Sequence, residues 1–203
     1  MKALHVFLAI VCGASTAAAA NSGDSAKTRE LIAVLQSNVD LAQRARACQQ
    51  LTIVGNEEAI APLAALLADE KLGHYAREAL EAMPYPAAGT ALRSALNALR
   101  GNLLIGVVNS LGMRRDAEAA GDLIKLANDP NSSVAPEAML ALGRIATPEA
   151  AANLLKILGA ASEAVTRAAA AEACLLIAEA QVAKDQRDSA IALYDRVRRA
   201  EVP

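Results

Sequence analysis

Nine residues of this chain read Glu118-Ala-Ala-Gly-Asp-Leu-Ile-Lys-Leu126, and 31 positions later the chain reads Glu149-Ala-Ala-Ala-Asn-Leu-Leu-Lys-Ile157. In both stretches the apolar residues recur at the three- and four-residue intervals of one helix face. A glutamate opens each stretch, where an acidic side chain favours the positive end of a helix. The two stretches therefore predict a helix that belongs to a repeating unit.

Two series of leucines extend this repeat over most of the chain. Each series has successive intervals of 29, 31 and 31 residues. The first series is Leu51, Leu80, Leu111 and Leu142, and the second is Leu63, Leu92, Leu123 and Leu154. Because two independent positions share one spacing pattern, we interpret the chain as an array of repeats.

Each unit contains two helical patterns with turn residues between them. The run Thr147-Pro148-Glu149 combines an N-cap residue, a proline at the first helical position and an acid in the first turn. We expect helix pairs at 28–36 with 41–54, 57–68 with 73–83, 87–99 with 102–113, 117–127 with 133–145, and 149–159 with 163–183, and a last helix at 188–200. One such pair cannot bury its apolar stripe alone, so the pairs are expected to stack into a solenoid.

The composition agrees with closely packed helices. Hydrophobic residues make up 54% of the chain, yet only 2% of residues are aromatic, and 50 of the 203 residues are alanine. Such a chain lacks the β-branched and aromatic side chains of a strand-rich protein. The 20 basic and 22 acidic residues give a formal charge of −2, which provides no basic footprint for nucleic acid.

The first twenty residues have the pattern of a secretory signal peptide. Lys2 precedes a short apolar run, and Ala18-Ala19-Ala20 forms a small-residue cleavage pattern before Asn21. We predict a signal peptide at residues 1–20, cleavage between Ala20 and Asn21, and a disordered mature N-terminus at 21–27. The alternative is an apolar N-terminal helix that stays in the protein. The run is too short to span a bilayer, so we expect a periplasmic or secreted protein without an integral membrane span after cleavage.

The residues that open and close the helices carry a family resemblance. The second helix ends Ala141-Leu-Gly-Arg-Ile145, a turn with Pro148-Glu149 follows, and the next helix continues as A-x-x-L-x-x-L. This pattern resembles the short HEAT-like repeats of bacterial proteins, over roughly residues 41–178. The resemblance implies an all-α fold, a right-handed α-solenoid of HEAT-like antiparallel helix pairs, which we assign to residues 28–178.

Two other passages add to the resemblance. The segments His74–Pro84 and Gly101–Gly112 are similar to exported bacterial HEAT-repeat proteins, whose arrays often precede carbohydrate-active or haem-containing domains. The stretch Ala178–Tyr194, followed by Pro203, is similar to a tetratricopeptide unit. We therefore predict a tetratricopeptide-like helical end at residues 179–203.

The sequence contains few residues suited to catalysis or metal binding. His74 is the only histidine after residue 20, so a site with two histidine ligands within one mature chain is not available. Phosphate-binding glycine motifs of the G-x-x-x-x-G-K and G-x-G-x-x-G types do not occur. Cys48 and Cys174 are expected to be buried thiols too far apart for a disulfide. We predict no catalytic residue, cofactor or metal.

We predict a protein–protein interaction scaffold that is not an enzyme, binds no nucleic acid, and has a protein partner the sequence does not identify. Two alternatives remain: the helical repeat portion of a larger exported enzyme, and a HEAT-like protein of the bilin lyase type. In HEAT-type solenoids the second helices line the concave surface, which implies eight candidate exposed residues: Arg44, Gln49, Tyr75, Arg77, Asn102, Asn109, Glu137 and Arg167.

Four of these candidates are our predicted partner-binding residues. Tyr75 and Arg77 come first, because tyrosine and arginine are enriched at binding hot spots, and Asn102 and Asn109 lie on the next second helix. The helix around 102–113 holds more apolar residues than one stripe needs. It is expected either to be buried in the middle of the array or to carry an apolar binding patch.

Overall fold

The computed structural model describes residues 14–129 and 132–200, and within these ranges it contains helices and no strand. Two short 3₁₀ turns, η1 (Glu57–Ala59) and η2 (Ala117–Ala119), precede α3 and α7. The α-helices are α1 (Ala14–Gln36), α2 (Leu41–Val54), α3 (Ile60–Ala64), α4 (Gly73–Ala82), α5 (Pro86–Ala95), α6 (Gly101–Met113), α7 (Ala120–Asn128), α8 (Ala135–Ile145), α9 (Pro148–Ala160), α10 (Ala164–Ala183) and α11 (Arg187–Arg199). The predicted all-α class is confirmed.

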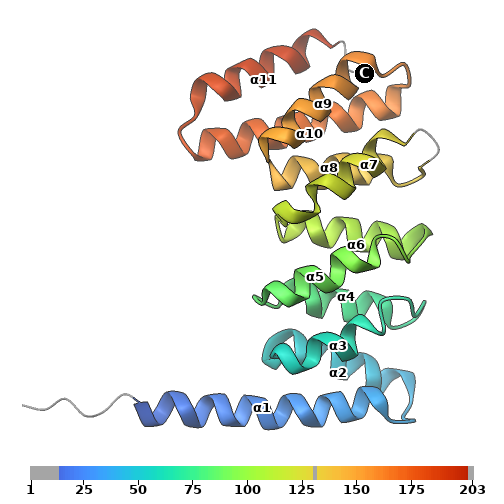
Figure 1. Ribbon diagram of the computed structural model, residues 1–203, viewed down its shortest axis with the longest axis vertical. Helices are drawn as coiled ribbons and strands as arrows, with labels where there is room; N and C mark the ends of the chain where they lie inside the picture. The colour runs from blue at the N-terminus through green and yellow to red at the C-terminus, as the bar shows by residue number, and fades with distance from the viewer. Residues whose placement is uncertain (1–13, 130–131, 201–203) are drawn as a thin grey trace, which may run out of the picture.

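Helix pairs stack one upon another along the long axis of the molecule, from α1 at the lower end of Figure 1 to α10 and α11 at the upper end. The second-helix layer consists of α2, α4, α6, α8 and α10, each of which contacts the next. The first-helix layer consists of α1, α3, α5, α7 and α9, and α11 packs against α10. We call the boundary between two successive pairs a seam. This stack of neighbouring pairs confirms the predicted helical repeat solenoid.

Both leucine series lie in the core of the stack. All eight leucines of the two series have 0% of their surface exposed. The apolar helix α6 is also largely buried, since Leu104, Val107 and Val108 are covered by its neighbours. Of the two possibilities for this helix, burial in mid-array holds for most of its length, although Met113 at its end is 60% exposed.

Local signals place most helix starts where the sequence predicts them. The Thr147 hydroxyl accepts a hydrogen bond from the Ala150 backbone N–H at 3.2 Å and caps α9. Asp40 caps α2 in the same way, by accepting from the Gln43 N–H at 2.8 Å. The helices α3 and α5 end earlier than expected. In the turn after α3, the Leu67 N–H bonds the carbonyl of Ala64, three residues back, which tightens the chain out of the α-helix.

The N-terminal prediction meets the structure only in part. Residues 1–13 of the predicted signal peptide lie outside the described residues. Residues 21–27, which we expected to be disordered, are helical, because α1 runs without a break from Ala14. Alanine has the highest helix propensity, and the C-terminal half of α1 is anchored by buried Leu31 and Leu35 and by Thr28, whose hydroxyl donates to the Val54 carbonyl at 2.8 Å. Cleavage between Ala20 and Asn21 stays a prediction.

The C-terminal end of α8 leads to a prediction about stability. Ala146 has φ 57° and ψ 41°, the left-handed conformation in which a Cβ is unfavourable. We expect Ala146→Gly to raise the free energy of unfolding by about 0.5–1 kcal/mol. Urea unfolding followed by circular dichroism measures the change. The matched control is Ala152→Gly in the middle of α9, which is expected to lower stability by about 1 kcal/mol. If both variants lowered the free energy of unfolding, the left-handed conformation of Ala146 would be contradicted.

Candidate functional site

The four predicted binding residues lie on two neighbouring helices of the second-helix layer. Tyr75 and Arg77 belong to α4, and Asn102 and Asn109 belong to α6. Asn102 is exposed, whereas the other three are half-buried. The structure brings Arg77 and Asn102 to the same hollow, but neither Tyr75 nor Asn109 lines it. Whether these residues bind a partner stays a prediction.

This hollow lies between the N-terminal parts of α4 and α6 and has a volume of about 250 Å³. Apolar side chains and glycines form part of its wall, and polar side chains add to it. The lining residues are Leu67, Glu70, Gly73, His74, Arg77, Asn102, Leu103, Gly106 and Val107. We call it the α4–α6 hollow. Its mixed lining and small size suit a single side chain of a partner better than a large ligand.

Arg77 is a structural link between α4 and α6, which corrects its expected exposure. Its side chain is only 17% exposed. Its Nη1 donates to the hydroxyl of buried Ser110 at 2.8 Å, and that hydroxyl in turn donates to Glu81 at 2.5 Å. Glu81 also lies 3.4 Å from Arg77 Nη1. Because its fork of donors is engaged inside the stack, Arg77 has less freedom to contact a partner than its residue type indicates.

His74 lies at the start of α4 with its side chain 61% exposed, as expected for a surface residue. Its Nδ1 lies 2.9 Å from Arg77 Nη2, and its Nε2 lies 3.2 Å from Oε1 of Glu78. The ring also meets Tyr75 edge to face at 5.4 Å. These contacts hold His74 in a chain of side-chain pairs on α4.

Two further arginines that we expected on the exposed surface, Arg44 and Arg167, donate to backbone carbonyls. Arg44 Nε donates to the Leu35 carbonyl at 3.1 Å, at the end of α1. Arg167 donates to the carbonyls of Ala161 and Ser162, just after α9, at 3.3 and 3.1 Å. Each arginine thereby satisfies carbonyls left free where a first helix ends. Gln49 is exposed as expected.

Glu137 on α8 is half-buried, and its Oε2 is covered and has no hydrogen-bond partner among the described residues. This carboxylate was expected to be exposed to a partner. Since α8 lies between α6 and α10 in the second-helix layer, its neighbours cover part of the side chain. Glu137 is thus a poorer contact residue than the sequence indicates.

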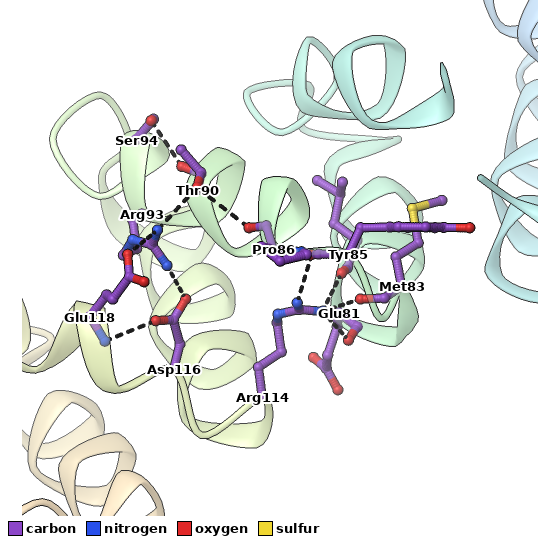
Figure 2. A network of polar contacts seen from close by, with 11 residues as sticks. Glu81, Met83, Tyr85, Pro86, Thr90, Arg93, Ser94, Arg114, Asp116 and Glu118 are labelled. Atoms are coloured by element: carbon purple, nitrogen blue, oxygen red, sulfur yellow. Dashed lines mark hydrogen bonds and ion pairs between the residues drawn. The ribbon is translucent and has the colours of Figure 1, made fainter. Parts of the chain in front are cut away.

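Arg114 makes the largest set of backbone contacts near the candidate residues, and sequence reasoning missed it. The side chain reaches from the end of α6 to the C-terminal end of α4, where helix carbonyls lack partners (Figure 2). Its Nη1 donates to the carbonyls of Leu80 (2.9 Å), Glu81 (2.8 Å) and Met83 (2.6 Å), and its Nη2 donates to that of Tyr85 (3.2 Å). We call this set of bonds the Arg114 clamp.

A signal for the clamp is present in the repeat. Arg114 follows Leu111 by three residues, and the corresponding residues after Leu51, Leu80 and Leu142 are apolar. These residues are Val54, Met83 and Ile145. A single arginine in an otherwise apolar repeat position indicates a polar partner inside the stack.

A second arginine joins the first-helix layer across the next seam. Arg93 near the end of α5 pairs with Asp116 and, at 2.7 Å, with Glu118 (Figure 2). Asp116 also accepts from the Glu118 N–H and so caps η2. The Asp116 side chain is 9% exposed and that of Arg93 19%. A partly buried pair with additional hydrogen bonds fixes the position of α5 relative to η2.

The thiols are free and buried, which confirms the sequence prediction for Cys48 and Cys174. Burial raises the pKa of each thiol from 9.0 to about 11, although the charge of Arg44 partly opposes this for Cys48. Within the described residues, no group of three or more histidine, cysteine, aspartate or glutamate side chains could hold a metal ion. In the same ranges no helix is long and apolar enough to cross a membrane.

The raised thiol pKa predicts slow chemical modification. Because the thiolate is the reactive form, we expect Cys48 and Cys174, in a Cys12→Ala chain, to react with a disulfide reagent at pH 8 at least about 100-fold more slowly than a free thiol. The rate should rise as the pH approaches 11. Absorbance of the released thiol measures it, and the denatured chain is the control. Fast reaction of either cysteine in the folded chain would contradict its burial.

Comparison with known proteins supports the repeat class. Residues 86–174 match the family described as HEAT repeats. No curated protein matches the chain. The matched range covers helices α5 to α9 and the first part of α10. With the stacked pairs of Figure 1, this match supports a HEAT-like repeat protein.

Proposed function

We propose that the chain is a non-catalytic scaffold of an extracytoplasmic compartment that binds a protein partner on its second-helix layer. The observation that carries the proposal is a row of exposed apolar side chains along this layer. Two residues after Leu51 and Leu111 of the first series lie Ile53 and Met113, which are 85% and 60% exposed. Between them, Ala82 occupies the same position on α4 and is also exposed.

Exposed apolar side chains at the same position of successive helices form a contact surface rather than scattered exceptions. Tyr75 and Asn109 lie on the helices that this row crosses. Aromatic and amide side chains beside an apolar row suit a protein partner, since such side chains combine buried area with hydrogen bonding. The bacterial origin, the export and the tetratricopeptide-like end belong to this proposal and rest on the sequence patterns alone.

Binding is tested with partners captured from the extracytoplasmic fraction by the tagged chain. We expect the pair Ile53→Asp and Met113→Asp to reduce the recovery of specific partners at least about tenfold, because each places a charge in a desolvated contact. Tyr75→Ala should reduce it less. The control is Lys125→Ala with Lys156→Ala on the first-helix layer. Equal recovery by the control and the aspartate pair would refute binding by this surface.

Export is tested separately. Mass spectrometry of the chain recovered from the extracytoplasmic fraction should show an N-terminus at Asn21. A chain that stays in the cytoplasm with residues 1–20 attached would overturn the localisation, whatever the binding experiment shows.

A further inference from the structure

The seams of the stack differ in how their helices touch. At the seam between α6 and α8, a Cβ added to Gly112 would lie 2.8 Å from the Ala141 Cα. At the seam between α8 and α10, a Cβ on Gly143 would lie 2.8 Å from both the Cα and the carbonyl oxygen of Ala173. In both places backbone lies directly against backbone. Because backbone atoms in contact cannot move aside as side chains can, a tilt of one helix pair against the next would bring these atoms into steric clash.

The seam between α4 and α6 also has glycines, but side chains face them. A Cβ on Gly106 would meet the Arg77 side chain, at 2.8 Å from Nε. A Cβ on Gly73 would lie 3.2 Å from Cδ2 of Leu103, although it also meets carbonyl oxygens of the preceding turn. Leu103 can change rotamer, whereas Arg77 is held by Ser110 and Glu81. The glycines of this seam are thus packed against side chains rather than against the backbone of the next second helix.

This seam has a hollow in each of its two helix layers. The fourth seam also has a groove, of about 600 Å³, at the end where α7 is followed by α8 and α9 by α10. The α4–α6 hollow, of about 250 Å³, opens between the second helices. A groove of about 660 Å³ lies between the first helices α3 and α5, and small side chains such as Ala64, Ala91 and Ala98 line much of it. Unfilled space on either side of a seam removes the packing contacts that would hold the two pairs at one angle.

In the described residues, side chains join the first-helix layer across each of the other three seams, the first, the third and the fourth. Arg29 lies 3.9 Å from Glu58 across the first seam. Arg93 pairs with Asp116 and Glu118 across the third, and Asn128 donates to Asn153 at 3.1 Å across the fourth. Among the described residues, no hydrogen bond or ion pair joins α3 to α5 across the second seam. At the second seam the described part of the first-helix layer is therefore held by apolar packing, without a side-chain hydrogen bond between α3 and α5.

The Arg114 clamp holds one end of this same seam. It ties the end of α6 to the C-terminal end of α4, whereas the α4–α6 hollow lies at the N-terminal ends of the two helices. The pair Arg77 and Ser110 lies between the two ends. The contact between α4 and α6 is thus held by hydrogen bonds at one end and borders a hollow at the other, so the clamp is the point about which the two helices could rotate.

We propose that the seam between the pairs α3–α4 and α5–α6 is a hinge, at which α1–α4 rotate as a block against α5–α11 about the Arg114 clamp. Rotation opens one of the two hollows as it closes the other. It also changes the angle between α4 and α6, and with it the curvature of the second-helix layer. The hinge does not depend on the proposed binding function.

Electron–electron distance measurements test the hinge. Spin labels at Gln49→Cys on α2 and Asn109→Cys on α6 span the hinge in a Cys12→Ala chain, in which the buried Cys48 and Cys174 stay unlabelled. The matched control pair is Asn109→Cys with Glu172→Cys on α10, which spans two second-helix seams but not the hinge. We expect the distance distribution across the hinge to be at least about twice as wide as that of the control pair. Equal widths would overturn the hinge.

A second variant tests whether the groove between α3 and α5 permits the rotation. Ala64→Leu with Ala91→Leu fills the groove between α3 and α5 and should narrow the distribution across the hinge while leaving the control pair unchanged. An unchanged width in a chain of unaltered helicity would show that the hollow does not permit the motion, and would also overturn the proposal. If the filled variant fails to fold, the comparison of the two label pairs in the parent chain decides alone.

Discussion

Replacing Arg114 with methionine should lower the free energy of unfolding by about 2–3 kcal/mol. The variant removes a charged group that donates to three carbonyls at the C-terminal end of α4 and to that of Tyr85, which precedes α5. Methionine keeps an unbranched side chain and matches Met83, which occupies this repeat position one unit earlier. The loss therefore reports the hydrogen bonds rather than a cavity. Thermal unfolding should shift down by about 5–10 °C.

The control for Arg114→Met is Arg46→Met on α2, because Arg46 is exposed and makes no hydrogen bond or ion pair with another described residue. That variant should change stability by less than about 0.5 kcal/mol. Hydrogen exchange adds a local measurement, since amides near the C-terminal end of α4 should exchange faster in Arg114→Met than in the parent. Similar losses for the two variants, or unchanged exchange in α4, would show that the clamp does not hold this helix end.

The helices, their pairing and the buried leucines could be predicted because they depend on local periodicity. Leu80 and Leu111 lie on the same face of successive second helices, and their spacing is visible in the chain itself. The 29-residue interval between Leu51 and Leu80 also marks the one unit that is shorter than the others. Repeated packing of one kind leaves a repeated pattern, which one sequence is enough to reveal.

The polar contacts between units could not be predicted in the same way. Arg77 carries the side chain expected of an exposed contact residue, yet it turns toward Ser110, 33 positions later. The local sequence pattern does not show which rotamer Arg77 adopts, or that the buried hydroxyl of Ser110 lies within its reach. Arg114 was overlooked for a related reason, since an arginine just after a helix indicates a solvated turn unless it is compared with the same position in other units.

The glycine of the A-L-G-x-I pattern shows how the structure explains a motif that the sequence only displayed. Gly112 and Gly143 occupy this position in successive second helices. In the structure each lies against an alanine of the next second helix, with no room for a side chain. The abundance of alanine and the scarcity of aromatic residues thus follow from helices that pack backbone to backbone.

Substitution of Gly143 provides the test with the largest expected effect on packing. A Cβ there would lie 2.8 Å from the Cα of Ala173 and 3.1 Å from its Cβ, so α8 and α10 must move apart to accept it. We expect Gly143→Val to cost about 3 kcal/mol. Gly143→Ala should cost about 1–2 kcal/mol, because alanine recovers part of the loss through its helix propensity. Urea unfolding measures both.

Gly159 in α9 is the matched control for Gly143, since no atom lies within 4 Å of a Cβ added there. Gly159→Ala should raise stability by about 0.5 kcal/mol, through helix propensity alone. The opposite signs of the two glycine-to-alanine changes separate packing from propensity, which acts in the same direction at both positions. If Gly143→Ala also stabilised the chain, the helices α8 and α10 would have room between them. The contrast between the backbone contact at Gly143 and the side-chain contact at Gly106 would then no longer hold.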